Sequence, residues 1–182
     1  YYTDREENLT VCDGKLVITA RKESYEGADV TSARIKTLDK VTFLYGYVVA
    51  SIKLPKTADG LWPAFWMMGN DITELGWPNC GETDVLEMGH ADGIKAGTQE
   101  QFLNGACHWG VPHHQFHANH ITHDYSVQDG EFHTYTCIWD EEYIRMYIDL
   151  EKRPSAAPYF EMKIEDFGNG EFRKDNFILF NL

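Results

Sequence analysis

The sequence has 182 residues, 43% of them hydrophobic, which is enough for one folded domain with a sizeable core. Lysine and arginine number 16 and aspartate and glutamate 29, and the resulting net charge of −13 argues against nucleic acid and anionic membrane surfaces as partners. No apolar run is long enough to span a bilayer, so we expect no membrane insertion.

The chain is predicted to be almost entirely strand and turn, because short β-rich segments alternate with Gly, Pro, Asn and Asp. In chain order, the predicted strands are residues 8–12, 15–21, 31–38, 41–54, 61–69, 81–89, 102–110, 132–140, 142–150 and 175–182. The predicted turns and loops are 24–28, 58–60, 70–80, 91–101, 111–129 and 154–158. Residues 1–182 are therefore expected to form one all-β domain, a curved antiparallel β-sandwich or jelly roll. The last predicted strand runs to Leu182 without a closing turn, and we expect the domain to be incomplete at both ends.

Residues 81–89, Gly-Glu-Thr-Asp-Val-Leu-Glu-Met-Gly, hold three carboxylates among strand-forming neighbours. Side chains alternate between the two faces of a strand, so Glu82 and Asp84 share a face while Glu87 would point away. One extra residue, a β-bulge between Asp84 and Glu87, returns Glu87 to that face. The stretch thus predicts three acids on one surface.

Aligned carboxylates suit several kinds of chemistry. Hard cations bind carboxylate oxygens, but this motif lies in a strand rather than in the flexible loops typical of Ca²⁺ sites. A solvated acidic face on an edge strand is the simplest alternative. Hydrolysis of a glycosidic bond with retained configuration needs two carboxyl groups about 5–5.5 Å apart, one ionised and one protonated. Neighbouring acids cannot both ionise easily, so a bulged strand favours this division of roles.

The motif Gly-Glu-Thr-Asp-Val-Leu-Glu resembles the bulged catalytic signature of glycoside hydrolase family 16. Nearly the whole chain is similar to that family, because other family motifs follow in the same order, at residues 31–35, 43–46 with 53–55, 61–69, 76–78, 108–110 and 132–140 with 143–149. The resemblance implies a jelly roll with a sugar-binding cleft on its concave face. It also implies endo-acting hydrolysis with retained configuration.

The resemblance further implies roles for individual residues. Glu82 matches the nucleophile, Glu87 the acid/base and Asp84 the assisting acid. The residues implied in substrate binding are Asn8, Arg34, Trp62, Trp66, Trp77 and His108. The alternatives are core packing for the tryptophans of 61–69 and for His108, and a surface ion pair for Arg34. No residue is assigned to a metal or a cofactor.

The bulged motif resembles laminarinases, agarases, carrageenases and endo-β-galactosidases. Because the negative net charge disfavours sulfated polymers, we favour a β-1,3-glucan of the laminarin type as the substrate. The runner-up is an endo-β-galactosidase acting on lactosamine-type or other galactose-containing glycans. A non-catalytic glucan-binding module and a calcium-bound structural sandwich are the alternatives from other classes. Hydrolysis of a polysaccharide implies a secreted, periplasmic or cell-surface protein.

Histidines and cysteines raise two further hypotheses. The predicted loop at 111–129 contains His113, His114, His117, His120 and His123. Their spacing suits a Zn²⁺ site, and a polar loop over the cleft is the alternative. The four cysteines contain no CxxC pair and are predicted to be buried free thiols, with a Cys107–Cys137 disulfide as the alternative.

The sequence departs from the family pattern in two ways. Thr83 stands in place of an aliphatic residue, and the residues of the family's convex-side calcium site are missing.

Overall fold

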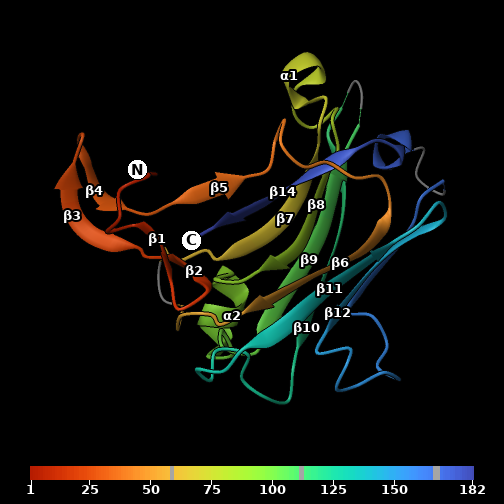
Figure 1. Ribbon diagram of the computed structural model, residues 1–182. Coiled ribbons are helices and arrows are strands. Elements are labelled where there is room, and N and C mark those ends of the chain that lie inside the picture. The colour runs from red at the N-terminus through yellow and green to blue at the C-terminus, as the bar shows by residue number, and fades with distance from the viewer. Residues whose placement is uncertain (58–59, 111–112, 166–168) are drawn as a thin grey trace.

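The computed structural model describes residues 1–57, 60–110, 113–165 and 169–182 (Figure 1). Residues 58–59 of the predicted turn and 111–112 of the predicted histidine-rich loop lie outside the described residues. Almost all regular structure is β. In chain order the strands are β1 (Leu9–Cys12), β2 (Lys15–Ile18), β3 (Arg21–Tyr25), β4 (Ala28–Thr31), β5 (Arg34–Lys36), β6 (Gly46–Ile52), β7 (Ala64–Gly69), β8 (Glu82–Glu87), β9 (Phe102–Trp109), β10 (Gln115–Thr122), β11 (His133–Trp139), β12 (Tyr143–Ile148), β13 (Phe160–Lys163) and β14 (Asn176–Asn181). The helices are α1 (Ile72–Leu75), α2 (Ala91–Ala96) and the 3₁₀ turn η1 (Gly170–Arg173).

Two antiparallel sheets pack face to face, which confirms the predicted β-sandwich of jelly-roll type. The larger sheet has the strand order β10-β9-β8-β7-β14-β5, and the smaller sheet has the order β13-β12-β11-β6. The hairpins β1–β2 and β3–β4 lie to one side of the sandwich (Figure 1). Strand β8 is central in the larger sheet, so its carboxylates are held by neighbours on both sides.

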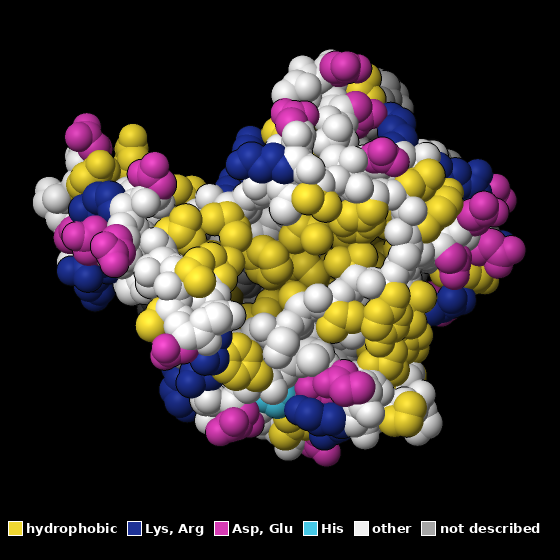
Figure 2. Space-filling view, viewed as in Figure 1, with side chains coloured by type: hydrophobic (Ala, Val, Ile, Leu, Met, Phe, Trp, Pro, Cys, Tyr) yellow, Lys and Arg dark blue, Asp and Glu magenta, His cyan; other side chains and the backbone are white. Residues whose placement is uncertain are grey.

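The core lies between the two sheets. It is formed by alternate side chains of the inner faces, among them Phe65, Leu86, Leu103, Tyr135 and Met146. On the face seen in Figure 2, hydrophobic side chains gather in a central hollow. Residues of β6 and β14 such as Val48, Ala50, Ile52, Ile178 and Phe180 pack against the core but are only partly buried. No helix of the described residues is long and apolar enough to cross a membrane.

Several segments predicted as loops contain regular structure. Glu26 and Gly27 have φ angles of 48° and 80°, and these positive values close β3 and β4 into a tight hairpin over residues 24–28. The short helices α1 and α2 lie in the predicted loops 70–80 and 91–101. Strand β10 occupies much of the predicted loop 111–129. It is the outermost strand of the larger sheet, where solvent accepts polar side chains on both faces, so its sequence lacks the usual alternation.

All four cysteines are free. Cys80, Cys107 and Cys137 are buried, as predicted, and no Cys107–Cys137 disulfide forms. Cys12 is exposed because β1 belongs to a hairpin outside the sandwich. Burial raises the pKa of the Cys137 thiol to about 12, which keeps it protonated and unreactive.

Candidate active site

The predicted β-bulge is present in β8. Against β9, Asp84 pairs with Ala106 and Glu87 pairs with Asn104, so three steps on β8 match two on β9. Against β7 the register shifts in the same place, and Val85 is the extra residue. The Tyr159 hydroxyl donates a hydrogen bond to the carbonyl of Val85, which gives a partner to a backbone group that the bulge removes from the ladder.

The bulge brings Glu82, Asp84 and Glu87 to one face of β8. All three line a hollow of about 380 Å³ on the outer face of the larger sheet. That volume falls within the range of small-molecule and cofactor sites. The sequence prediction that the three acids share one surface is therefore confirmed.

Glu87 is held by two neutral donors. The Trp62 indole Nε1–H donates to Oε1 at 2.9 Å, and the Asn104 amide donates to Oε2 at 2.9 Å. Asn104 is only 6% exposed, and its position on β9 faces Glu87 across the ladder. These two hydrogen bonds fix the orientation of the Glu87 carboxyl group.

Glu82 and Asp84 titrate together. Burial raises the pKa of Glu82 to about 8, the charge of Asp84 adds to the rise, and His108 opposes it. Burial, followed by the charge of Glu87, raises the pKa of Asp84 well above its ordinary value. Because adjacent buried carboxylates repel each other when both are ionised, the pair Glu82 and Asp84 favours keeping one proton between them.

One end of the cleft is built around Arg34. Its guanidinium lies 4.7 Å from the centroid of the Tyr2 ring and 5.4 Å from that of Trp66. Asn181 accepts from Trp66 Nε1 at 2.9 Å and donates to the backbone carbonyl of Trp62 at 3.2 Å, so one amide holds the Trp66 indole and the Trp62 backbone. Trp66 is 9% exposed and also packs in a small core cluster, whereas Trp62 is 38% exposed.

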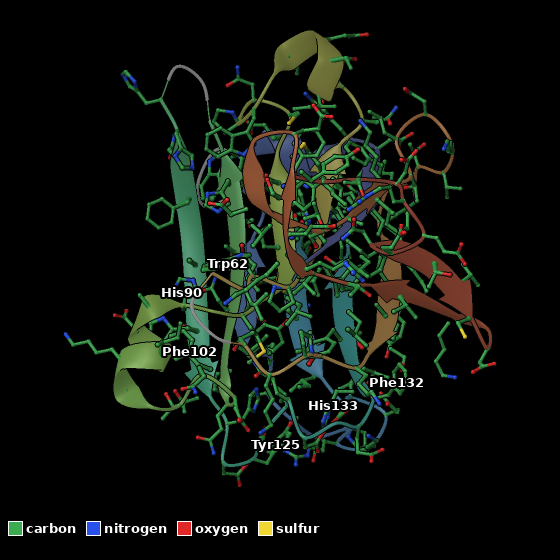
Figure 3. The ribbon with its side chains drawn as sticks, turned by 90° about the vertical axis from the view of Figure 1, so that its left-hand side faces the viewer. Trp62, His90, Phe102, Tyr125, Phe132 and His133 are labelled. Carbon is green, nitrogen blue, oxygen red and sulfur yellow. The ribbon has the colours of Figure 1, made fainter. Side chains whose placement is uncertain are left out.

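Trp62, which bonds Glu87, is also the first ring of a row that continues through His90 and Phe102 (Figure 3). Its ring lies 4.8 Å from that of His90, which in turn lies 5.7 Å from the ring of Phe102. The Phe102 ring stacks on His120 of β10 at 4.9 Å.

A second aromatic wall lies beside the residues that line the hollow, and it is formed by Trp77, His108, His114 and Phe116. His108 pairs directly with Glu82 across β8 and β9, and Phe116 of β10 is next in that row. The His108 Nδ1 and His114 Nε2 atoms are 2.9 Å apart in a hydrogen bond. Trp77 packs on His114 with 4.7 Å between ring centroids. Trp77 and Phe116 are 48% and 64% exposed, so their faces are available to a ligand.

Two of the sequence-based expectations are wrong. Asn8 has no exposed surface: its amide donates to the Thr19 carbonyl and to Thr31 Oγ1, both at 3.0 Å, within the N-terminal hairpins. The predicted zinc loop is instead β10, and the alternation of a strand sends His117 and His120 to opposite faces. His117 contacts the Glu161 carbonyl of the smaller sheet at 3.2 Å.

Four site residues escaped the sequence prediction: Tyr2, Asn104, His114 and Asn181. For Asn104 a signal was available, because it precedes His108 by four positions on a predicted strand and therefore shares its face. No local pattern marks Tyr2 or Asn181, which reach the cleft from opposite ends of the chain.

The fold is a β-sandwich, and carboxyl groups aligned on one face of a strand are the arrangement that glycoside hydrolases use. The family model "Glycosyl hydrolases family 16" matches residues 1–158, and the chain belongs to this family.

Two relatives and one solved structure illustrate the similarity. Clotting factor G alpha subunit of Tachypleus tridentatus is 33% identical over 184 residues, covering 100% of this chain and 25% of that protein. Glucan endo-1,3-beta-glucosidase A1 of Niallia circulans is 35% identical over 162 residues, covering 82% of this chain and 22% of that protein. The chain thus spans about a quarter of the length of these relatives. A family 16 endo-glucanase structure from Bacteroides ovatus has a TM-score of 0.83 and 35% identity, covering 97% of this chain and 72% of that one.

Proposed function

We propose that this chain is the catalytic domain of a retaining endo-β-glycosidase that cleaves internal linkages of a β-1,3-glucan. The observation that carries the proposal is the alignment of Glu82 and Glu87 on one face of β8, across the bulge and on the lining of the cleft. The glucan substrate is supported by the names of similar proteins, an endo-1,3-beta-glucosidase and an endo-glucanase.

In the proposed mechanism, the Glu82 carboxylate attacks the anomeric carbon while Glu87 gives its proton to the departing glycosidic oxygen. This forms a glycosyl ester with Glu82. Glu87, now a base, takes a proton from water that attacks the same carbon, and Glu82 leaves with its electron pair. Two displacements return the sugar to its original configuration.

Asp84 assists by holding the shared proton. It is 3% exposed, so its charge is the less well hydrated of the neighbouring pair. The charge of Asp84 is one of the causes that raise the pKa of Glu82. A proton on Asp84 removes that repulsion and so favours the ionised form of Glu82 for attack.

The two aromatic walls supply the binding surface. Arg34 and Trp66 form one end of the cleft, and Trp77 and His108 flank Glu82 on the other. Aromatic faces pack against the apolar faces of sugar rings, which suits a chain of several residues lying across the sheet. A polymeric substrate is met outside the cytoplasm, so we infer a secreted, periplasmic or cell-surface protein.

Two other functions remain as outcomes of the test. An endo-β-galactosidase would use the same carboxylates on a galactose-containing glycan. A non-catalytic glucan-binding module would use the walls alone, and one relative is named as a clotting-factor subunit rather than as a glucanase.

The test is reducing-sugar release from laminarin, mixed-linkage glucan, agarose and lactosamine glycans by the wild type and by Glu82→Gln and Glu87→Gln. The proposal predicts activity on laminarin that falls by roughly 10³-fold or more in both variants. Activity on galactose-containing glycans alone would favour the endo-β-galactosidase. Slower migration of the protein through a gel that contains laminarin, without release of reducing ends, would favour the binding module. Full activity in Glu82→Gln would contradict the mechanism.

A further inference from the structure

We propose that Glu82, Asp84 and His108 form a binding site for a first-row transition metal such as Zn²⁺, and that the bound metal blocks the active site. One ligand atom from each residue lies within 4.8 Å of the other two. The two acids are two positions apart on β8 and share a face, and His108 is directly opposite Glu82 on β9. Three side chains from two neighbouring strands thus converge on one point.

The distances are close to those of a zinc site. A tetrahedral Zn²⁺ with bonds of 2.0–2.1 Å to nitrogen and oxygen has ligand atoms about 3.3 Å apart. His108 Nε2 and Asp84 Oδ2 are already 3.4 Å apart. The pairs that involve Glu82, at 4.8 Å or less, need to close by at most about 1.5 Å, which rotation of its side chain can supply.

The surroundings of one carboxylate oxygen in this cluster also point to a cation. Asp84 Oδ2 is buried and accepts no hydrogen bond from the described residues, and its ion-pair contact with His108 Nε2 is long, at 3.4 Å. A buried polar atom without a hydrogen-bond partner is destabilising, and more so when it is charged. A metal ion bound to Oδ2 satisfies this oxygen and neutralises the repulsion between Asp84 and Glu82.

His108 is oriented as a metal ligand. Its Nδ1 is engaged by His114 Nε2 at 2.9 Å, which leaves Nε2 directed at Asp84. Metal-bound histidines almost always donate their second ring N–H to an acceptor, usually a carboxylate, a backbone carbonyl or water, and this acceptor fixes both the tautomer and the ring direction. Here the neutral His114 Nε2 takes the place of that acceptor. Trp77, packed on His114 at 4.7 Å, holds that partner in place.

The donor set selects the kind of metal. One imidazole nitrogen with two carboxylates suits Zn²⁺, Co²⁺ or Ni²⁺, whereas Ca²⁺ and Mg²⁺ require six or more oxygen ligands. Three protein ligands leave one position open to water. The consequence for the proposed function is inhibition, because a Glu82 carboxylate bound to metal cannot attack the anomeric carbon. This consequence rests on the proposed function, and the metal binding does not.

The site differs from the one that the histidine spacing suggested. His117 and His120 lie on opposite faces of β10 and are matched controls, being histidines of a neighbouring strand. The experiment is titration of the metal-free protein with ZnCl₂ by isothermal calorimetry, for the wild type, His108→Ala, His114→Ala, and the double control His117→Ala/His120→Ala. Thermal melts without metal verify that each variant is folded.

We expect one saturable Zn²⁺ site in the wild type and in the double control, loss of that site in His108→Ala, and binding weakened by about 10–100-fold in His114→Ala. Replacement by Co²⁺ should give the visible absorption of a four- or five-coordinate ion with nitrogen and oxygen ligands in the wild type. Unchanged zinc binding in folded His108→Ala, or no saturable binding in the wild type, would overturn the proposal.

A second arm measures laminarin hydrolysis with and without Zn²⁺ over a range of laminarin concentrations. We expect inhibition that excess substrate relieves and EDTA reverses. Non-competitive inhibition, or none at saturating Zn²⁺, would overturn the blocking role. Absence of activity in EDTA would count against the proposed hydrolase while leaving the calorimetric result to decide the metal site.

Discussion

Glu82 and His108 lie directly opposite each other on β8 and β9, and their side chains share the outer face of the larger sheet. The next position in the same row is Phe116 on β10. The candidate nucleophile is therefore the inner end of a row that leads across two strands to an exposed aromatic ring at the edge of the sheet.

Phe116→Ala should weaken binding of long glucans without affecting folding. Phe116 is 64% exposed, so its loss should change the free energy of unfolding by less than about 0.5 kcal/mol. An aromatic contact of about 0.5–1.5 kcal/mol corresponds to a roughly 2–10-fold higher KM for laminarin. Phe132→Ala is the control, because Phe132 is 40% exposed and lies far from Trp62 and His90 (Figure 3). Equal KM values for Phe116→Ala and the wild type would exclude this role.

Asn104→Ala should lower kcat by roughly 10–100-fold, because a hydrogen bond to a charged group contributes about 1.5–3 kcal/mol. Asn104 positions Glu87, the proposed acid/base, through a 2.9 Å hydrogen bond, so the pH profile of kcat should change as well. Asn119→Ala is a matched control: Asn119 is on the neighbouring strand and donates instead to the Tyr159 carbonyl at 2.6 Å. A lower kcat with an unchanged pH profile of kcat would mean that Asn104 has only a structural role.

Tyr159→Phe tests what maintains the bulge. The variant keeps the ring but leaves the Val85 carbonyl without the donor that it has in the wild type. We expect a loss of about 1–3 kcal/mol in stability, or about 2–4 °C in Tm for each kcal/mol, together with a lower kcat. Tyr47→Phe, at an exposed position of β6, should change neither. If Tyr159→Phe were as stable and active as the wild type, the bulge would not depend on this bond.

Asp149→Asn tests a buried histidine–aspartate hydrogen bond outside the cleft. Burial acts to raise the pKa of Asp149, but hydrogen bonds from His133, at 2.7 Å, and from the Thr134 N–H outweigh it, so the pKa lies below its usual value. The stabilisation is therefore present above the unfolded pKa of about 3.9 and is lost as pH falls through the lower folded value. The variant should have a lower Tm at pH 7, and the difference should shrink below about pH 4. A constant difference from pH 7 to pH 3 would contradict this linkage.

The alternation of side chains was sufficient to predict the main features of the site. The position of Glu87 five residues after Glu82 required a bulge, and the bulge is where the parity argument put it. The strand predicted over 61–69 contains Pro63, which has no N–H to donate to the ladder, and β7 begins one residue later, at Ala64. These inferences hold because β8 and β7 are central strands, whose pattern is fixed by burial on one face and the ladder on both sides.

Features set by tertiary packing could not be predicted in this way. The side chain of Asn8 turns into a polar network with Thr31, 23 positions away, and no local pattern encodes that choice. β10 is polar because it is an edge strand. Its histidine-rich sequence therefore lacks the apolar alternation of a strand, and it was predicted as a loop. Asn181 reaches Trp66 across 115 positions of sequence.

The central claim is that Glu82 and Glu87 cleave a β-linked glucan by two displacements. The most direct measurement is ¹H NMR of the anomeric protons during the first minutes of laminarin hydrolysis, before mutarotation mixes the anomers. Retention predicts that the β-anomer of the new reducing end appears first and that the α-anomer follows slowly. Initial appearance of the α-anomer would show inversion by a single displacement and would contradict the assignment of Glu82 as the nucleophile.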